Sequence, residues 1–143
     1  MTDYPTTWWK HTGKMSEFEH GISSPILCNL VTSEELPSSK LPVGALYASN
    51  PTMKHYVYHT GPDGLTIFCV RFPNDGDWCI DGRASNCTLP HDKEHRCWVR
   101  YGTVGEKLTV DKNGLTCAAG AGSFFMDDQK WHGFLRDGVL RQG

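Results

Sequence analysis

The sequence predicts a mainly β fold, and three observations support this prediction. Short apolar stretches bounded by turn signals follow one another from residue 43 onward. Two pairs, Asn113–Gly114 and Asp137–Gly138, stand between such stretches and match the preferred residues of a two-residue β-hairpin turn. Helical periodicity of useful length is missing. We therefore expect a small antiparallel sandwich or barrel built from hairpins, with little helix.

The size and composition are those of one ordinary globular domain. The chain has 143 residues, a formal net charge of −2 and 21% charged residues, so it shows no overall basic footprint for nucleic acid. No apolar run reaches the length of a signal-peptide core or a membrane span. We expect a reducing cytosol, no membrane partner and no double-stranded nucleic-acid partner.

The first part of the chain is polar, apart from a few aromatic residues. We expect an irregular N-terminal arm over residues 1–25, pinned to the surface by Trp8 and Trp9, and a single β-rich domain over residues 26–143. Just inside that domain, Ser33 is a candidate N-cap for one helical turn.

The middle of the chain predicts strands that pair with near neighbours. "HYVYHT" (55–60) and "LTIFCVRF" (65–72) flank the turn "GPDG" (61–64), and the second stretch is apolar on both faces, as in a central strand covered on both sides. "DWCID" (77–81) is expected to pair with "HRCWVRYG" (95–102). In the last hairpin, a two-residue loop puts Leu135 opposite Leu140 and Arg136 opposite Val139.

The stretch "CTLPHDKEHRC" (87–97) concentrates possible metal ligands. Thiolate and imidazole are the ligands of structural zinc, although this spacing lacks the usual close cysteine pair. Three interpretations stay open: a structural zinc site, a disulfide among Cys79, Cys87 and Cys97, or plain packing. The candidate ligands are Cys87, His91, His95 and Cys97.

The same stretch contains "HDKEH", an inverted zincin motif in which Glu94 would be the general base for a zinc-bound water. That motif needs a long helix. Pro90 precedes it and a strand-like stretch follows, so a zinc-dependent hydrolase is kept only as an alternative.

Alternation along the next strand separates two faces. Val99 and Tyr101 mark one face as the core face. The other face carries Arg96, Trp98 and Arg100, which suit an anion attached to something flat, because Arg binds phosphate or carboxylate in a bidentate manner and Trp stacks. A solvated strand face with one packed tryptophan is the plainer interpretation.

Three further stretches are candidates for binding. "DGRASNC" (81–87) adds Arg83, Ser85 and Asn86 in a polar loop, and Trp131–His132 opens the last hairpin. "CAAGAGS" (117–123) is rich in glycine but lacks the lysine of a phosphate-binding loop, and we expect a close-packed crossing there.

The words "IDGRASNCT", "HRCWVR", "VDKNG", "TCAAGAGS" and "WHGFL" resemble a group of small uncharacterised proteins of actinobacterial phages. The resemblance covers the C-terminal half, from Trp78 onward. This chain departs from the group at Tyr101, where the group has a histidine, and at "SFFMDDQK" (123–130), where the group has a shorter link. The resemblance implies a phage origin and the cytoplasm of an infected bacterium, and it supplies no catalytic residue.

Taken together, these observations favour a non-enzymatic phage accessory protein that binds a host protein or an anionic, nucleotide-like small molecule. A zinc-dependent hydrolase and a virion component are the alternatives. The expected contact residues are Arg83, Ser85, Asn86, Arg96, Trp98, Arg100, Trp131 and His132.

Overall fold

The protein is mainly β, as the sequence predicts. The structure is a computed structural model, and it describes residues 3–16, 24–48, 67–73, 76–81, 89, 91–92, 98–112 and 133–142. Its strands are β1 (Asp3–Pro5), β2 (Thr7–Met15), β3 (Pro25–Asn29), β4 (Glu35–Pro37), β5 (Ala45–Ala48), β6 (Phe68–Arg71), β7 (Asp77–Cys79), β8 (Trp98–Tyr101), β9 (Thr109–Lys112), β10 (Gly133–Arg136) and β11 (Val139–Gln142). One 3₁₀ turn, η1, covers Ser38–Lys40.

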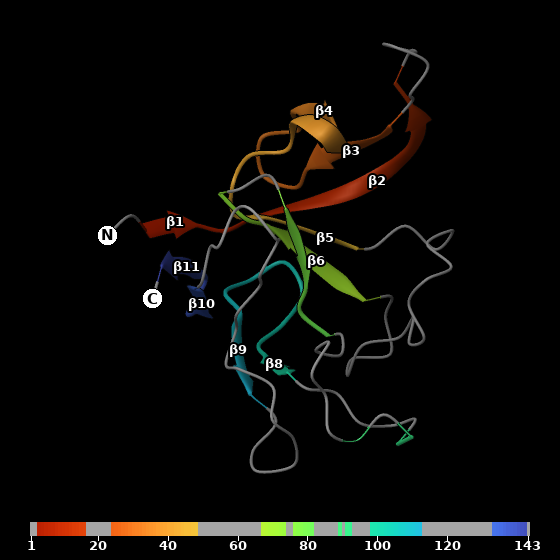
Figure 1. Cartoon of the computed structure of the whole chain (residues 1–143). Helices are drawn as coiled ribbons and strands as arrows, with labels where there is room; N and C mark the ends of the chain where they lie inside the picture. Colours follow the sequence, from red (N-terminus) through yellow and green to blue (C-terminus); the bar gives the residue numbers. More distant parts are fainter. Residues whose placement is uncertain are drawn as a thin grey trace.

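The described strands form three open sheets (Figure 1). The largest has the order β4-β3-β2-β5-β6-β7, a second has the order β1-β11-β10, and β8 pairs with β9. The β2–β5 ladder is parallel, with Thr7 opposite Ala45 and Trp8 opposite Leu46. The other described ladders are antiparallel, so the expected antiparallel architecture is modified at this one pair.

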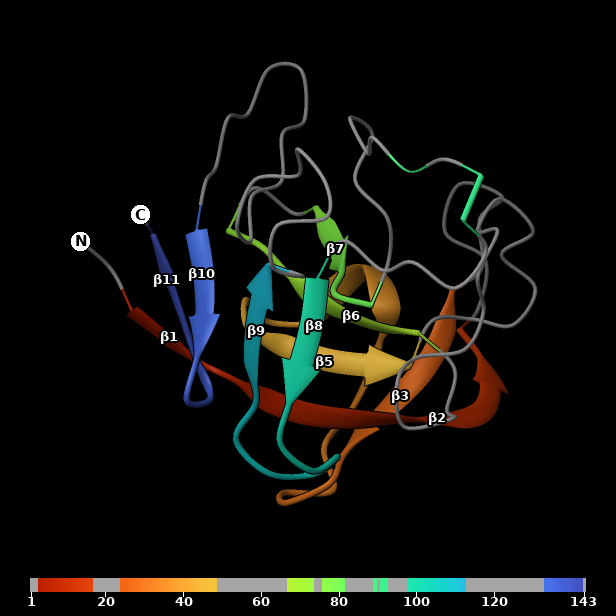
Figure 2. The ribbon, with the colours of Figure 1, turned by 90° about the horizontal axis from the view of Figure 1, so that it is seen from below.

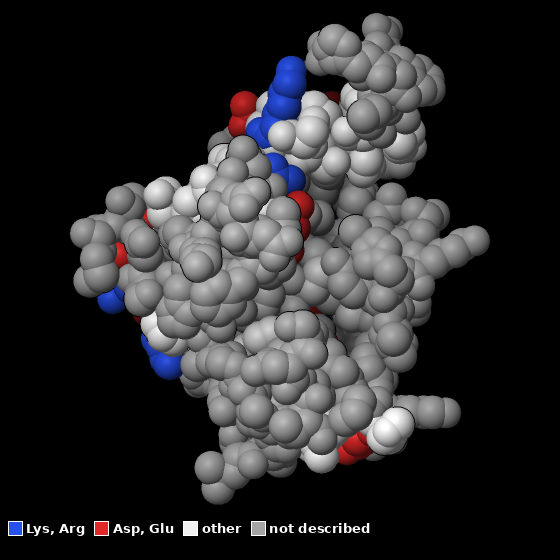
Figure 3. All heavy atoms as spheres, in the orientation of Figure 1, with Lys and Arg blue, Asp and Glu red and all other residues white. Residues whose placement is uncertain are grey.

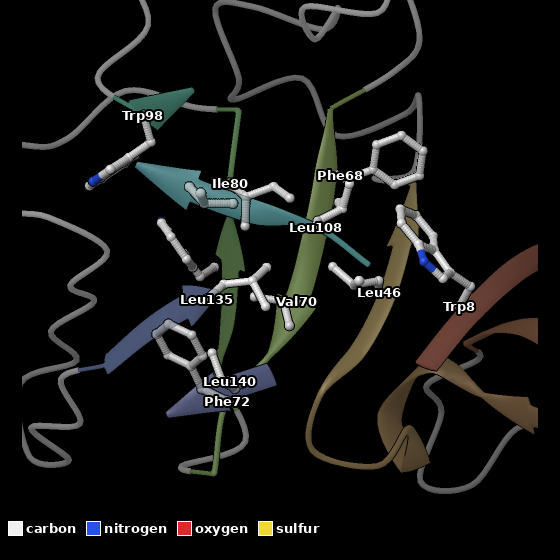
Figure 4. Close-up of a cluster of buried hydrophobic side chains, with 12 residues drawn as sticks. Trp8, Leu46, Phe68, Val70, Phe72, Ile80, Trp98, Leu108, Leu135 and Leu140 are labelled. Carbon is white, nitrogen blue, oxygen red and sulfur yellow. The ribbon is translucent and has the colours of Figure 1, made fainter. Parts of the chain in front are cut away.

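The sheets stack in two layers, with β8 and β9 running across β2 and β5 (Figure 2). Aromatic and aliphatic side chains from both layers meet between them and exclude water, which makes a small β sandwich. Figure 4 shows this main core, which consists of Trp8, Leu46, Phe68, Val70, Phe72, Trp78, Ile80, Trp98, Leu108, Val110, Leu135 and Leu140.

The expectation of an irregular N-terminal arm is wrong for residues 3–16, which form β1 and β2. Both tryptophans are buried rather than pinned to the surface: Trp8 lies in the main core, and Trp9 lies in a second core on the opposite face of the sheet. The local sequence does not reveal β1, because its backbone pairs with β11, far along the chain. β2 pairs with β3, the next strand along the chain, and with β5.

The predicted helical turn at Ser33 is also wrong. Ser33 has a positive φ of 65° in the turn between β3 and β4, and the short 3₁₀ segment follows β4 instead. Asn29 organises this turn, because its side-chain Oδ1 accepts the backbone N–H groups of Val31 and Thr32 at 2.8 and 3.1 Å.

The central strand is confirmed, whereas the partner predicted for 77–81 is not. β6 lies between β5 and β7 and is buried on both faces. β7 pairs with β6, and β8 pairs with β9, so the predicted pairing of 77–81 with 95–102 is not among the described ladders. The predicted turns at 61–64 and at Asn113–Gly114 lie outside the described residues.

The last hairpin is confirmed in its register. Leu135 faces Leu140 and Arg136 faces Val139. Both turn residues, Asp137–Gly138, have positive φ angles of 47° and 74°, as a type I′ turn requires. Among the described residues, no helix has the length and apolar character needed to cross a membrane.

Candidate functional site

The structure describes three of the predicted site residues: His91, Trp98 and Arg100. His91 is exposed in a turn, and no group of three metal-binding side chains occurs within the described ranges. The zinc site therefore stays a prediction. The other predicted site residues lie outside the described part of the chain: Arg83, Ser85, Asn86, Cys87, His95, Arg96, Cys97, Trp131 and His132.

The two faces of β8 are the reverse of the prediction. Tyr101 is 58% exposed, whereas Trp98 and Arg100 are 5% and 7% exposed. The Trp98 ring packs edge-on against the Trp78 ring, with centroids 5.4 Å apart, and this contact between the two layers holds it in the main core. Trp98 and Arg100 therefore do not lie on an exposed contact surface.

Arg100 is held by an ion pair inside the sandwich. Its Nε lies 2.8 Å from Oδ1 of Asp81, and the two side chains are 3% and 0% exposed. The Asp81 Oδ2 accepts the backbone N–H of Phe68 at 3.0 Å, and the guanidinium lies over the Phe68 ring at 4.6 Å from its centroid. Arg100 thus ties β8 to the ends of β6 and β7, and its charge is neutralised there.

Two connections contain the remaining predicted contact residues, and both join the β8–β9 pair at the same end. Residues 82–97 lead into β8 at Trp98, and residues 113–132 leave β9 at Lys112, which is the residue opposite Trp98. Residues 113–132 then lead into β10 at Gly133, and β8, β9 and β10 lie side by side in Figure 2. The β10–β11 turn lies at the other end of β9, where the Asp137 N–H donates to Thr109.

A second cluster of chemically active side chains was missed by the sequence analysis. It lies on the face of β5, β6 and β7 that points away from the main core, and we call it the thiol face. Tyr47, Cys69 and Cys79 are opposite one another across the three strands, and Arg71 and Asp77 form the next pair. Residues two apart in a strand share a face, so all five belong to the same surface of the sheet.

Arg71 is the best-connected member of the thiol face. Its Nε donates to Oδ1 of Asp77 at 2.7 Å, and its side chain is 7% exposed. Its terminal nitrogens donate to the backbone carbonyls of Ser38 at 2.6 Å and Leu41 at 3.3 Å. The guanidinium therefore connects the sheet to η1 and the segment after it.

The surroundings on the thiol face favour the protonated forms of the Tyr47 hydroxyl and the Cys69 thiol. Burial is the main cause that raises the pKa of the Tyr47 hydroxyl, and the nearby Cys69 and Asp77 raise it further, Asp77 also through a hydrogen bond. The hydrogen bond with Cys79 is the main cause that raises the pKa of the Cys69 thiol well above its usual range, followed by burial. Neither group is a ready base or nucleophile at neutral pH.

One sequence signal does point to the thiol face. "CVR" (69–71) and "DWC" (77–79), aligned in opposite directions, pair Cys with Cys and Arg with Asp, as they do in the structure. Complementary pairs of this kind are typical of neighbouring antiparallel strands.

Comparisons with protein families, with curated proteins and with solved structures found no match. The surface view in Figure 3 shows described Lys and Arg side chains at separate places on one face rather than gathered in a basic patch.

Proposed function

We propose that this protein acts by binding an anionic small molecule of nucleotide type, through side chains of the connections 82–97 and 113–132. The observation that carries the proposal is the place where these connections join the β8–β9 pair. The chain enters β8 at Trp98, directly opposite Lys112, where it leaves β9. The connection 82–97 is rich in polar residues, and the connection 113–132 contains Phe124, Phe125 and Trp131. Both meet the β8–β9 pair at one end, and loops on a β scaffold often carry binding residues.

The buried arginines support this choice of residues by elimination. Arg71 and Arg100 are each paired with an aspartate inside the protein, so neither offers its charge to an external anion. Arg83 and Arg96, which belong to the connection 82–97, are the proposed cations. The remaining contacts of the proposed surface are Ser85, Asn86, Trp131 and His132.

A phage origin and action in the cytoplasm of an infected bacterium are part of the same proposal, since they come from the resemblance of the C-terminal half. In that setting the ligand would be a soluble nucleotide of the host. The zinc-dependent hydrolase, the host-protein partner and the virion component stay predictions. Native mass spectrometry with and without a chelator tests for zinc directly.

The test is titration calorimetry of the folded chain with a panel of ATP, a cyclic dinucleotide and pyrophosphate. The variant carrying Arg83→Ala and Arg96→Ala is expected to bind the best ligand at least about tenfold more weakly, because each Arg–phosphate contact is charge-assisted and about 1.4 kcal/mol is a factor of ten. Its melting temperature is expected to stay that of the unmodified chain.

Arg141→Ala is the matched control, because its side chain is 61% exposed and lies on β11, outside both connections. This variant is expected to bind like the unmodified chain. Equal affinity of the Arg83/Arg96 variant, or no binding of any panel member at millimolar concentration, overturns the proposal.

A further inference from the structure

We propose that Cys69 and Cys79 form a reversible disulfide between β6 and β7, which makes this pair an oxidation site in the protein. The proposal rests on the described thiols alone and does not depend on the proposed ligand.

The two thiols are close together and in register. Their Sγ atoms lie 3.1 Å apart, and the residues are directly opposite each other in the antiparallel β6–β7 ladder. A disulfide between them needs no change of register and no new pairing of strands.

The backbone geometry at the two cysteines also suits a disulfide. On either side of the cysteines, the Ile80 N–H donates to the Phe68 carbonyl and the Phe72 N–H donates to the Gly76 carbonyl. Hydrogen-bonded pairs alternate with non-hydrogen-bonded pairs along an antiparallel ladder, so Cys69 and Cys79 form a non-hydrogen-bonded pair. Such pairs have Cα atoms about 4.5 Å apart, which is within the range of about 4.4–6.8 Å that disulfides span.

The two cysteines differ in their exposure to an oxidant from solvent. Cys69 is 2% exposed, whereas Cys79 is half-buried and lies on β7, the last strand in the described order of its sheet. Cys79 is the more exposed of the two residues, so we expect a small oxidant to react with its sulfur first, and the Cys69 sulfur lies beside it. This is the arrangement of an attacking and a resolving cysteine.

Hydrogen peroxide serves as the oxidant in the proposed step. The Cys79 thiolate attacks one peroxide oxygen, the O–O bond breaks, and Cys79 becomes a sulfenic acid while hydroxide takes up the thiol proton as water. The Cys69 sulfur then attacks the Cys79 sulfur, the S–O bond breaks and a second water leaves. Two thiols are oxidised and one peroxide is reduced to two waters. The raised pKa of Cys69 slows the second step, because the thiolate is the attacking form.

The disulfide would fix the segment 77–81, which supplies the aspartates of the Arg71 and Arg100 ion pairs. Asp77 lies two residues before Cys79 and pairs with Arg71, and Asp81 lies two residues after it and pairs with Arg100. Oxidation therefore anchors β7 covalently between these two contacts, and reduction leaves it held by noncovalent contacts alone.

The sequence makes the test direct, because trypsin separates the cysteines. Cleavage after Lys and Arg leaves Cys69 in peptide 55–71, Cys79 in peptide 72–83 and Cys28 in peptide 15–40. The reduced, folded chain is treated with one equivalent of hydrogen peroxide, alkylated under denaturing conditions, and digested without reductant. The expected main oxidised product is peptide 55–71 linked to 72–83, which dithiothreitol separates.

Thermal unfolding before and after oxidation gives a second readout. The melting temperature is expected to rise on oxidation in the unmodified chain and in the Cys28→Ser control, whose half-buried cysteine lies on β3. The rise is expected to vanish in Cys79→Ser. The proposal is overturned if Cys69 and Cys79 are both recovered alkylated after oxidation, or if either is linked mainly to another cysteine peptide.

Discussion

Two ion pairs in this protein have the same chemistry and opposite surroundings. Arg100 and Asp81 lie inside the sandwich with side chains 3% and 0% exposed, whereas Arg141 and Asp3 join β11 to β1 with side chains 61% and 51% exposed. A buried pair that loses one partner leaves an uncompensated charge in the core, and an exposed pair leaves a hydrated one. The comparison shows that the role of an arginine here depends on its depth in the fold.

The largest effect is expected for the buried pair. Arg100→Ala should lower the free energy of unfolding by about 3–5 kcal/mol, because Asp81 then stays buried without its cation. Urea denaturation followed by tryptophan fluorescence measures this loss. A second variant with Arg100→Met and Asp81→Leu should recover part of it, because no buried charge remains. A loss below about 1 kcal/mol in Arg100→Ala would contradict the assigned burial.

An intermediate effect is expected on the thiol face. Arg71 is 7% exposed but Asp77 is 35% exposed, so water solvates the carboxylate that is left behind. Arg71→Ala should cost about 2–3 kcal/mol, mainly because the carbonyls of Ser38 and Leu41 lose a charged donor. A double-mutant cycle with Asp77→Ala isolates the ion pair, and purely additive losses would show that the pair itself contributes nothing.

A pH-dependent effect is expected from Tyr47. Its pKa is raised in the folded state, so the folded chain keeps a proton that the unfolded chain releases above about pH 10. The stabilisation is present below pH 10 and is lost as the pH rises, by up to about 1.4 kcal/mol per pH unit for one group. Tyr47→Phe should flatten the fall of stability between pH 9.5 and about 11 in urea denaturation. An unchanged slope of stability against pH in Tyr47→Phe would refute the assignment to Tyr47. The raised pKa of Cys69 contributes to this slope with the same sign in both chains.

The smallest effect is expected for the exposed pair. Arg141→Ala should change the free energy of unfolding by about 0–1 kcal/mol, because its partner Asp3 lies 3.5 Å away in solvent. The difference should shrink further in about 1 M salt, where screening is strong. A loss as large as that of Arg100→Ala would remove the distinction between the two pairs.

The best sequence prediction concerns the hairpin β10–β11. The local backbone conformation of its turn, Asp137–Gly138, fixes the register of the two residues on either side. The structure has Leu135 opposite Leu140, as expected. The mainly β class was predictable for the same reason, since turn residues and short apolar stretches are local signals.

The faces of β8 were not predictable in this way. Strand alternation separates Trp98 and Arg100 from Val99 and Tyr101, but which set turns inward depends on what packs against the strand. Here Trp78 on β7 and Asp81, two residues after the strand, supply the contacts, and the sequence near β8 does not indicate them. The thiol face has the same origin, because it exists only once β6 and β7 are paired.

The pairing of β1 with β11 has a consequence for how the chain folds. The hydroxyl of Thr6 donates to the carbonyl of Gly138 across 132 positions, and Figure 1 shows the first and last strands side by side. Closing so large a loop is entropically costly, and contacts of this separation form late. Among the described ladders β1 pairs with β11 alone, so during synthesis its edge stays unpaired until β11 has been made. We expect slow final folding, and a need for protection against aggregation during that interval.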